Sequence, residues 1–303
     1  MKKLLMALMA ASVLLGGCTS KKTTDDYTGP VVTADTMSDS EKELQMIQSC
    51  ISDYNNDAIS DQEDLYQVSI PSLPIGITSL PEINSLSDLS EVKDSETNSN
   101  AIYVATYTIQ DAYYATFTIY KATTGSFWLN GNITFNIDPD AVTSDNPDYA
   151  SYKSSLDTLL AEDNDILNWL YGINVTLGTT EVEDGYYEVT AMGSYHPTSI
   201  DDIKTIAESV FTTDFLQNNY YQASFEGNSP VFKEINGKLC CVQTELTDRT
   251  YPVYDTSKII AVSEDDTSIN IDLLTKINDQ DQTEIKRIVI SKTENGYRLP
   301  QNY

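Results

Sequence analysis

Two stretches of alternating apolar and polar residues constrain the fold of this chain most strongly. In residues 103–137 three such segments follow one another, joined by short polar connections. The pattern returns after Pro230 and passes through Asn236-Gly237, a pair that favours a tight hairpin turn. A period of two puts successive side chains on opposite faces of a strand. The first stretch therefore predicts an antiparallel meander, and the second predicts one curved antiparallel sheet that runs to residue 299.

Helical periodicity precedes each stretch of strands. Ser38 or Ser40 can cap a helix with acidic residues in its first turn, and its apolar residues recur up to Ile51. Ser199 and Asp202 have the spacing of a second helix start, at the third position after the cap. Further helices are expected over 149–160, 166–171 and 214–221.

The order of these elements predicts an α+β fold, with helices packed on one face of antiparallel sheets. Residues 65–92 contain three prolines and predict an extended edge segment or an ordered loop. Residues 91–100 predict a polar loop. The length suits two domains. We expect an N-terminal α+β module with a β-meander over 40–160 and a C-terminal domain over 161–303.

The first eighteen residues have the pattern of a bacterial lipoprotein signal peptide. Lys2 and Lys3 precede a short apolar run, which ends in the lipobox-like Leu15-Gly16-Gly17-Cys18. The run is too short to span a bilayer as a helix. We therefore expect a signal peptide over 1–17, a lipid on Cys18, a flexible spacer over 18–39, and an extracytoplasmic protein anchored to the cell membrane. The alternative is an ordinary secretory signal with an incidental cysteine.

The chain is strongly acidic and rich in tyrosine. A net charge of −28 predicts no binding to nucleic acid or to anionic headgroups through a general field. It favours cationic partners, or serves solubility alone. Twenty tyrosines suit either contact surfaces or half-buried strands. The candidates for partner binding in the second half are Tyr220, Tyr221, Tyr251 and Tyr254.

Cysteine and histidine offer little chemistry. With Cys18 lipidated, an odd number of cysteines remains, Cys50, Cys240 and Cys241, and no spacing resembles a zinc site. The single histidine, His196, precedes Pro197 at a helix entry, and no nucleophile elbow or phosphate-binding loop is present. We expect a protein without enzymatic activity and without a cofactor.

One acidic segment aligns loosely with a twelve-residue calcium loop. It follows the first expected helix, but position 6 is Ala58 instead of glycine and position 12 is an aspartate. The default interpretation is a solvated acidic loop, and a weak calcium site is the alternative. The ligands of that site would be Asp53, Asn55, Asp57, Ile59, Asp61 and Asp64.

The second half contains a series of short motifs in a recognisable order. They are Asp201-Asp202-Ile203, Val210-Phe211-Thr212, Thr213-Asp214-Phe215, the hairpin from Pro230 to Leu239, Ser257-Lys258-Ile259-Ile260 and Ile269-x-Ile271. In this order, residues 200–272 resemble the bacterial DL-endopeptidase inhibitor family (IseA-like domains). Cys240 stands where relatives would have an aromatic residue.

The resemblance implies a cystatin-like cone, in which helices pack on a curved antiparallel sheet. It also implies binding to a cell-envelope protein such as a cell-wall DL-endopeptidase, whose cleft would be blocked without a covalent step. Two other functions stay open: a solute- or glycan-binding lipoprotein, and a structural surface lipoprotein. A deep polar pocket would favour the first. A large exposed apolar patch would favour the second.

Overall fold

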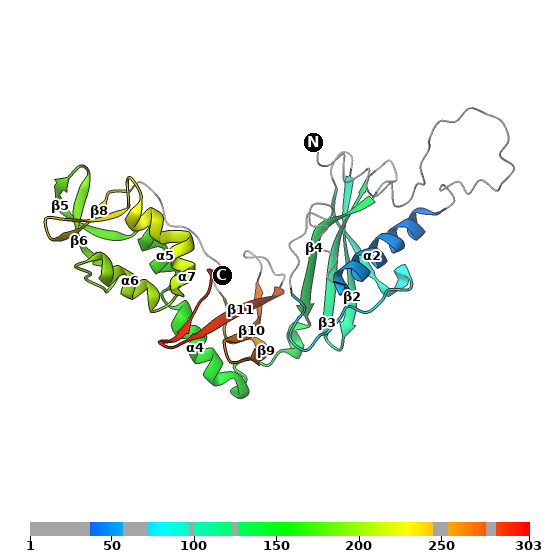
Figure 1. Cartoon of the computed structure of the whole chain (residues 1–303). Helices are drawn as coiled ribbons and strands as arrows, with labels where there is room; N and C mark the ends of the chain where they lie inside the picture. The colour runs from blue at the N-terminus through cyan, green and yellow to red at the C-terminus, as the bar shows by residue number, and fades with distance from the viewer. Residues whose placement is uncertain (1–36, 57–71, 97–99, 123–126, 245–253, 277–282) are drawn as a thin grey trace, which may run out of the picture. The chain divides into compact units, whose positions relative to one another are not determined.

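The computed structural model forms two compact units, which divide between Ala141 and Val142 (Figure 1). The residues that the structure describes are 37–56, 72–96, 100–122, 127–244, 254–276 and 283–303.

The first unit opens with helix α2 (Asp39–Asn55). Its N-cap is Ser38, whose side chain accepts a hydrogen bond from the Glu41 N–H, while the Glu41 carboxylate accepts one from the Ser38 N–H. This reciprocal capping box fixes where the helix begins, and it confirms Ser38 as the cap. The face that α2 buries carries Ile47, Cys50 and Ile51.

A four-stranded antiparallel sheet in the order β1-β2-β3-β4 completes this unit. The expected meander is confirmed as β2 (Asn100–Gln110), β3 (Tyr113–Ala122) and β4 (Phe127–Ile137). The polar loop expected over 91–100 was wrong, because Ser90–Glu96 forms strand β1 and pairs with β2. Every residue of β1 is exposed, so pairing with β2 and not burial makes it a strand.

Helix α2 lies across this sheet in Figure 1, and the Tyr54 ring meets the Phe135 ring edge-on at 5.9 Å. Between residues 72 and 89 the proline-rich segment contains one short element, the 3-10 helix η2 (Leu86–Asp88). The Asn55 side chain ties this segment to α2, since its amide both donates to and accepts from the Leu80 backbone at 2.8 Å. The ordered loop expected here is confirmed over 72–85.

The second unit contains four α-helices and a π-helix. Leu156 and Leu159 bury their side chains in the same core as the rest of this unit. The boundary expected between residues 160 and 161 would separate them from that core, whereas the contacts divide the chain nineteen residues earlier. The elements are α4 (Ala150–Leu160), α5 (Asp163–Leu170), α6 (Ile200–Glu208), α7 (Thr213–Leu216) and the π-helix η5 (Gln217–Glu226), with the 3-10 turn η4 (Pro147–Tyr149) before α4. The 3-10 turn η3 (Pro139–Ala141) is the last element of the first unit.

The strands of the second unit form two sheets, where one was expected. The hairpin after Pro230 turns at Asn236 and Gly237, which have φ of 52° and 76°, but it joins an earlier hairpin and not the strands that follow. One sheet has the order β5 (Val175–Glu183), β6 (Tyr186–Met192), β8 (Lys238–Val242) and β7 (Phe232–Ile235). The other has the order β12 (Gly296–Arg298), β11 (Thr283–Thr293), β10 (Ser268–Lys276) and β9 (Ile259–Glu264).

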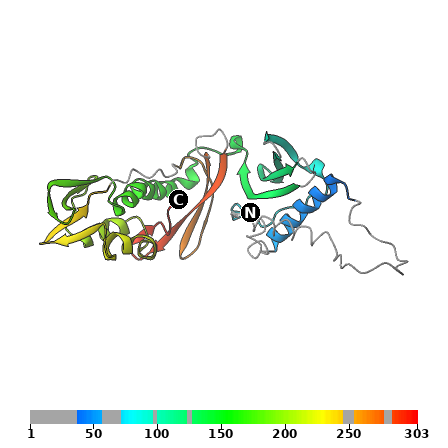
Figure 2. The same cartoon turned by 90° about the horizontal axis from the view of Figure 1, so that it is seen from above.

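The two sheets of this unit share one apolar core with its helices. In Figures 1 and 2 the helices lie between the sheet of β5 and the sheet of β11. Val189 of one sheet, Ile271 of the other and Leu167 of α5 belong to the same buried cluster. The chain is therefore α+β, with three antiparallel sheets in its described part.

Candidate functional site

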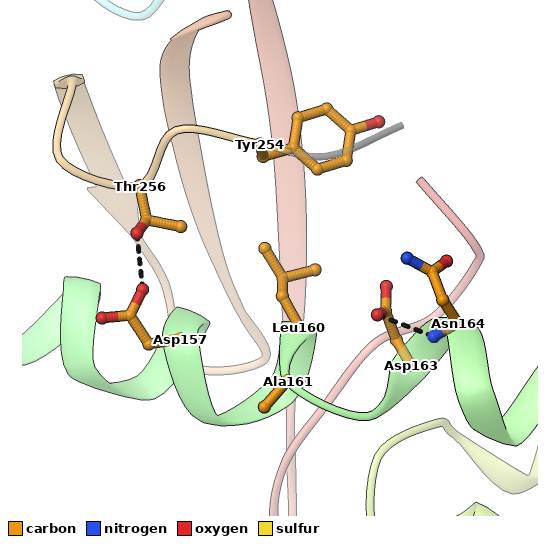
Figure 3. A pocket seen from close by; sticks show the side chains of 7 residues that line it. All are labelled: Asp157, Leu160, Ala161, Asp163, Asn164, Tyr254 and Thr256. Atoms are coloured by element: carbon orange, nitrogen blue, oxygen red, sulfur yellow. Dashed lines mark hydrogen bonds between the residues drawn. The ribbon is translucent and has the colours of Figure 1, made fainter. Parts of the chain in front are cut away.

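A hollow of about 250 Å³ opens where α4 gives way to α5 (Figure 3). Its floor comes from the end of α4 and the start of α5, and its other wall comes from the segment that leads into β9. The residues that line it are Asp157, Leu160, Ala161, Asp163, Asn164, Tyr254 and Thr256.

Asp163 is the most unusual residue of this hollow, because its side chain is only 5 % exposed. It is the first residue of α5, a place where acidic residues normally face water and favour the helix dipole. One carboxylate oxygen accepts the Asn164 N–H at 2.7 Å. Burial raises the pKa of Asp163 to about 6, against the lowering effect of backbone hydrogen bonds, and the Asp165 charge adds to the rise.

The second carboxylate of the hollow, Asp157, forms an ion pair with a lysine of the same chain. It accepts hydrogen bonds from Lys153 at 2.8 Å and from Thr256 at 2.5 Å. Burial alone would raise the pKa of Asp157, but these two hydrogen bonds outweigh it and lower the pKa. The Lys153 ammonium thus gives Asp157 a counter-charge. Asp163 receives none from any lysine, arginine or histidine that the structure describes.

Tyr254, one of the tyrosines proposed for partner binding, lines the hollow. Its ring lies above Leu160 in Figure 3, and the side chain is half-buried. Burial, together with the nearby Asp163 and Glu284 carboxylates, raises the pKa of Tyr254 to about 12. The hydroxyl therefore stays protonated at neutral pH and can act as a hydrogen-bond donor.

The lining of the hollow combines polar and apolar side chains. A buried carboxylate, a phenol and an amide surround it, and apolar side chains form the remaining wall. Such a site can hold a positive charge or a hydrogen-bond donor. Its lining contains no histidine, cysteine or serine.

The other tyrosine candidates are not on this surface. Tyr220 and Tyr221 were wrong as docking residues, because they are 7 % and 4 % exposed and belong to the core. The π-helix has more than four residues per turn, so neighbouring side chains diverge less than in an α-helix and both rings turn inward. The Tyr221 hydroxyl donates to Glu208 at 2.9 Å. Tyr251 lies outside the described residues.

The structure describes only the first part of the expected calcium loop. Asp53 and Asn55 belong to α2, and both polar atoms of the Asn55 amide bond to Leu80. The Asn55 amide is thus held against the Leu80 backbone. No group of three or more metal-binding side chains occurs among the described residues. Asp57, Ile59, Asp61 and Asp64 lie outside them, as does Cys18.

The remaining candidate residues are the histidine and the three cysteines of the described chain. His196 is exposed, and its Nδ1 lies 2.8 Å from the Thr190 carbonyl oxygen. Cys50, Cys240 and Cys241 are free and buried. Cys241 lies in the main core, while Cys240 points to the opposite face of β8 and is nevertheless covered.

Sequence reasoning missed Asp163. An aspartate before an apolar helical segment normally indicates a solvated first turn, and nothing in the local pattern distinguishes a buried one. In the part of the chain that the structure describes, no helix combines the length and hydropathy needed to cross a bilayer. No protein-family model matches the chain, and no curated protein sequence matches it significantly.

Proposed function

We propose that this chain is an extracytoplasmic lipoprotein, anchored through Cys18, that binds a protein of the cell envelope and has no enzymatic activity. The bound protein is a cell-wall DL-endopeptidase of the papain-like class, and the chain inhibits it by covering its cleft without a covalent step. The signal-peptide pattern over residues 1–18 and the resemblance over residues 200–272 support this proposal.

The observation that carries the proposal is the hollow at the junction of α4 and α5. It presents a buried carboxylate on a chain with a net charge of −28. Such a site favours a cationic group of a partner, because a buried charge that gains a counter-charge contributes more than an exposed one. The long-range field of the acidic chain would also speed the approach of a basic surface.

The arrangement of the second unit is compatible with the same proposal. Helices α4, α5, α6 and α7 pack with two antiparallel sheets around one core. We propose that this unit is a cystatin-like cone, in which loops at one end contact the peptidase. Fold similarity alone does not establish inhibition, so the proposal depends on a binding measurement.

The two other functions have less support. Pockets for drug-sized ligands measure roughly 300–1,000 Å³, so a hollow of about 250 Å³ suits a side-chain-sized group better than an oligosaccharide. A structural lipoprotein would expose a large apolar patch. The large apolar side chains that are exposed among the described residues are Val92 and Tyr297, which belong to different units.

The test is an inhibition assay with purified papain-like DL-endopeptidases and a cell-wall peptide substrate. We expect the chain to inhibit at least one of them competitively, and we expect added salt to weaken the inhibition because it screens the acidic surface. Affinity capture from envelope extract, eluted with rising salt, identifies which peptidase to assay. Full activity of several such enzymes at a large excess of the chain would contradict the proposal.

A further inference from the structure

We propose that the hollow between α4, α5 and residues 254–256 binds a primary ammonium or guanidinium group carried on an alkyl chain, with the Asp163 carboxylate as its counter-charge. This inference names the group that the second unit recognises, and in that respect it rests on the proposed function. The site would accept the same cation from a free small molecule.

The first argument is the cost of burying Asp163. An ionised carboxylate taken out of water costs several kcal/mol unless a counter-charge or hydrogen bonds compensate it. The partners of Asp163 are the backbone N–H groups of Asn164 and of Asp163 itself. Among the described residues, no lysine, arginine or histidine pairs with it, although Lys153 pairs with Asp157 in the same hollow. A cation entering from solution would complete this site.

The second argument is the shape of the site. Leu160 and Ala161 offer an apolar wall for methylene groups, and the Tyr254 ring stands opposite Asp163 (Figure 3). An alkyl chain with a terminal charge needs such a combination, because its stem prefers apolar surface while its head needs an anion. An aromatic ring beside the cation adds a favourable contact.

The third argument separates an organic cation from a metal ion. Calcium takes six to eight oxygen ligands, usually with several carboxylates among them. Asp157 is already held by Lys153 and Thr256, which leaves Asp163 as the one carboxylate of the lining without a cationic partner among the described residues. One carboxylate with apolar walls suits a singly charged organic group.

The test uses the full chain and a set of small probes: N-acetyl-lysine amide, N-acetyl-arginine amide, and N-acetyl-norleucine amide as the neutral match. Binding is followed by nuclear magnetic resonance through the amide signals of Asn164 and Ala161. We expect the two cations to bind with a Kd on the order of 1–10 mM, as befits a single desolvated ion pair. We expect at least a tenfold weaker response to norleucine amide.

Two variants sharpen the test. Asp163→Asn should weaken binding of the cations at least tenfold, while keeping the hydrogen bond to the Asn164 N–H. Asp165→Asn removes the same charge from an exposed position two residues away and should change Kd less than twofold. The inference would be overturned if norleucine amide bound equally well or if the two variants lost binding equally. It would also be overturned if the cations gave no response at about 50 mM, well above the expected Kd, or if Ca²⁺ bound more strongly.

The source of the cation is distinguished in the peptidase assay. If Asp163→Asn loses both the binding of the probes and the inhibition, the cation is a lysine or arginine side chain of the peptidase. If it loses the probes and still inhibits, the ligand is a free cation. If neither protein inhibits any peptidase while the probes still bind, the proposed function fails and the cation site stands.

Discussion

Arg287 on β11 lies directly opposite Asp272 on β10, and its Nε and Nη2 donate to the two carboxylate oxygens at 2.8 and 2.9 Å. The Asp272 side chain is 1 % exposed. The two parallel hydrogen bonds satisfy a carboxylate that would otherwise be costly to bury. This pair therefore links the two central strands of the β9–β12 sheet.

Replacing Arg287 with methionine should destabilise the second unit strongly. The substitution leaves the buried Asp272 without this counter-charge, which typically costs about 3–5 kcal/mol. The free energy of unfolding in urea measures it. Lys286→Met is the control, because it removes an exposed cation from the next position of the same strand. Similar losses in the two variants would show that the pair has no special role.

Asp163 should make the chain less stable as pH rises. The pKa of Asp163 in the folded chain is about 6, above its ordinary 3.8. The stability that its protonated carboxyl contributes to the fold is therefore fully present below pH 3.8 and is lost as pH rises through 6. The Asp165 charge also raises this pKa, and Asp157 and Tyr254 line the same hollow. Asp163→Asn should therefore be more stable than the parent by roughly 2–3 kcal/mol at pH 8 and equal to it near pH 3.5. Thermal unfolding across this range measures the difference, and Asp165→Asn should show no such crossover.

A methyl group at Gly193 should not be tolerated. Its φ is +58°, and an added Cβ would lie 2.7 Å from the buried Trp169 ring. Gly193→Ala should cost about 2–4 kcal/mol, as the sum of backbone strain and overpacking. Gly185→Ala is the matched control, since Gly185 also has a positive φ of +83° and nothing within 4 Å. Equal unfolding free energies in the two variants would contradict the predicted clash.

Lys121 should be the residue that holds α2 and β1 to β3. Its Nζ lies 3.0 Å from Glu43 and 2.6 Å from Glu91, and 4.4 Å from the centre of the Tyr103 ring. Burial raises the pKa of Glu43 despite this lysine. Lys121→Met should lower the stability of the first unit by about 2–4 kcal/mol, and Glu43→Gln in the same background should recover part of the loss. Hydrogen exchange of the α2 amides measures both; no recovery in the double variant would exclude a charge effect.

Local rules predicted the elements whose ends are set by neighbouring residues. Ser38 with Glu41 and Ser199 with Asp202 form the two capping boxes that start α2 and α6. Asn236 makes the predicted turn for the same reason, because the conformation of a tight turn depends on a few adjacent residues.

Elements that depend on distant partners could not be predicted in this way. Strand β1 has no buried face, so alternation gives no sign of it. Strand β5 departs from regular pairing between Leu177 and Glu181, which hides its period. The division into two sheets depends on the pairing of β8 with β6, a contact some fifty residues apart. The hollow beside Asp163 is lined also by Tyr254, which lies still farther along the chain.

The adjacent cysteines of β8 have a consequence for handling and export. Burial raises the pKa of Cys241 to about 12, and of Cys50 to about 12, and it also raises the pKa of Cys240. Because the thiolate is the reactive form, roughly one Cys241 in 10⁵ is ready to react at neutral pH. The described thiols should thus be inert to oxidants and alkylating agents while the chain is folded. Its stability should be the same in reducing and oxidising surroundings.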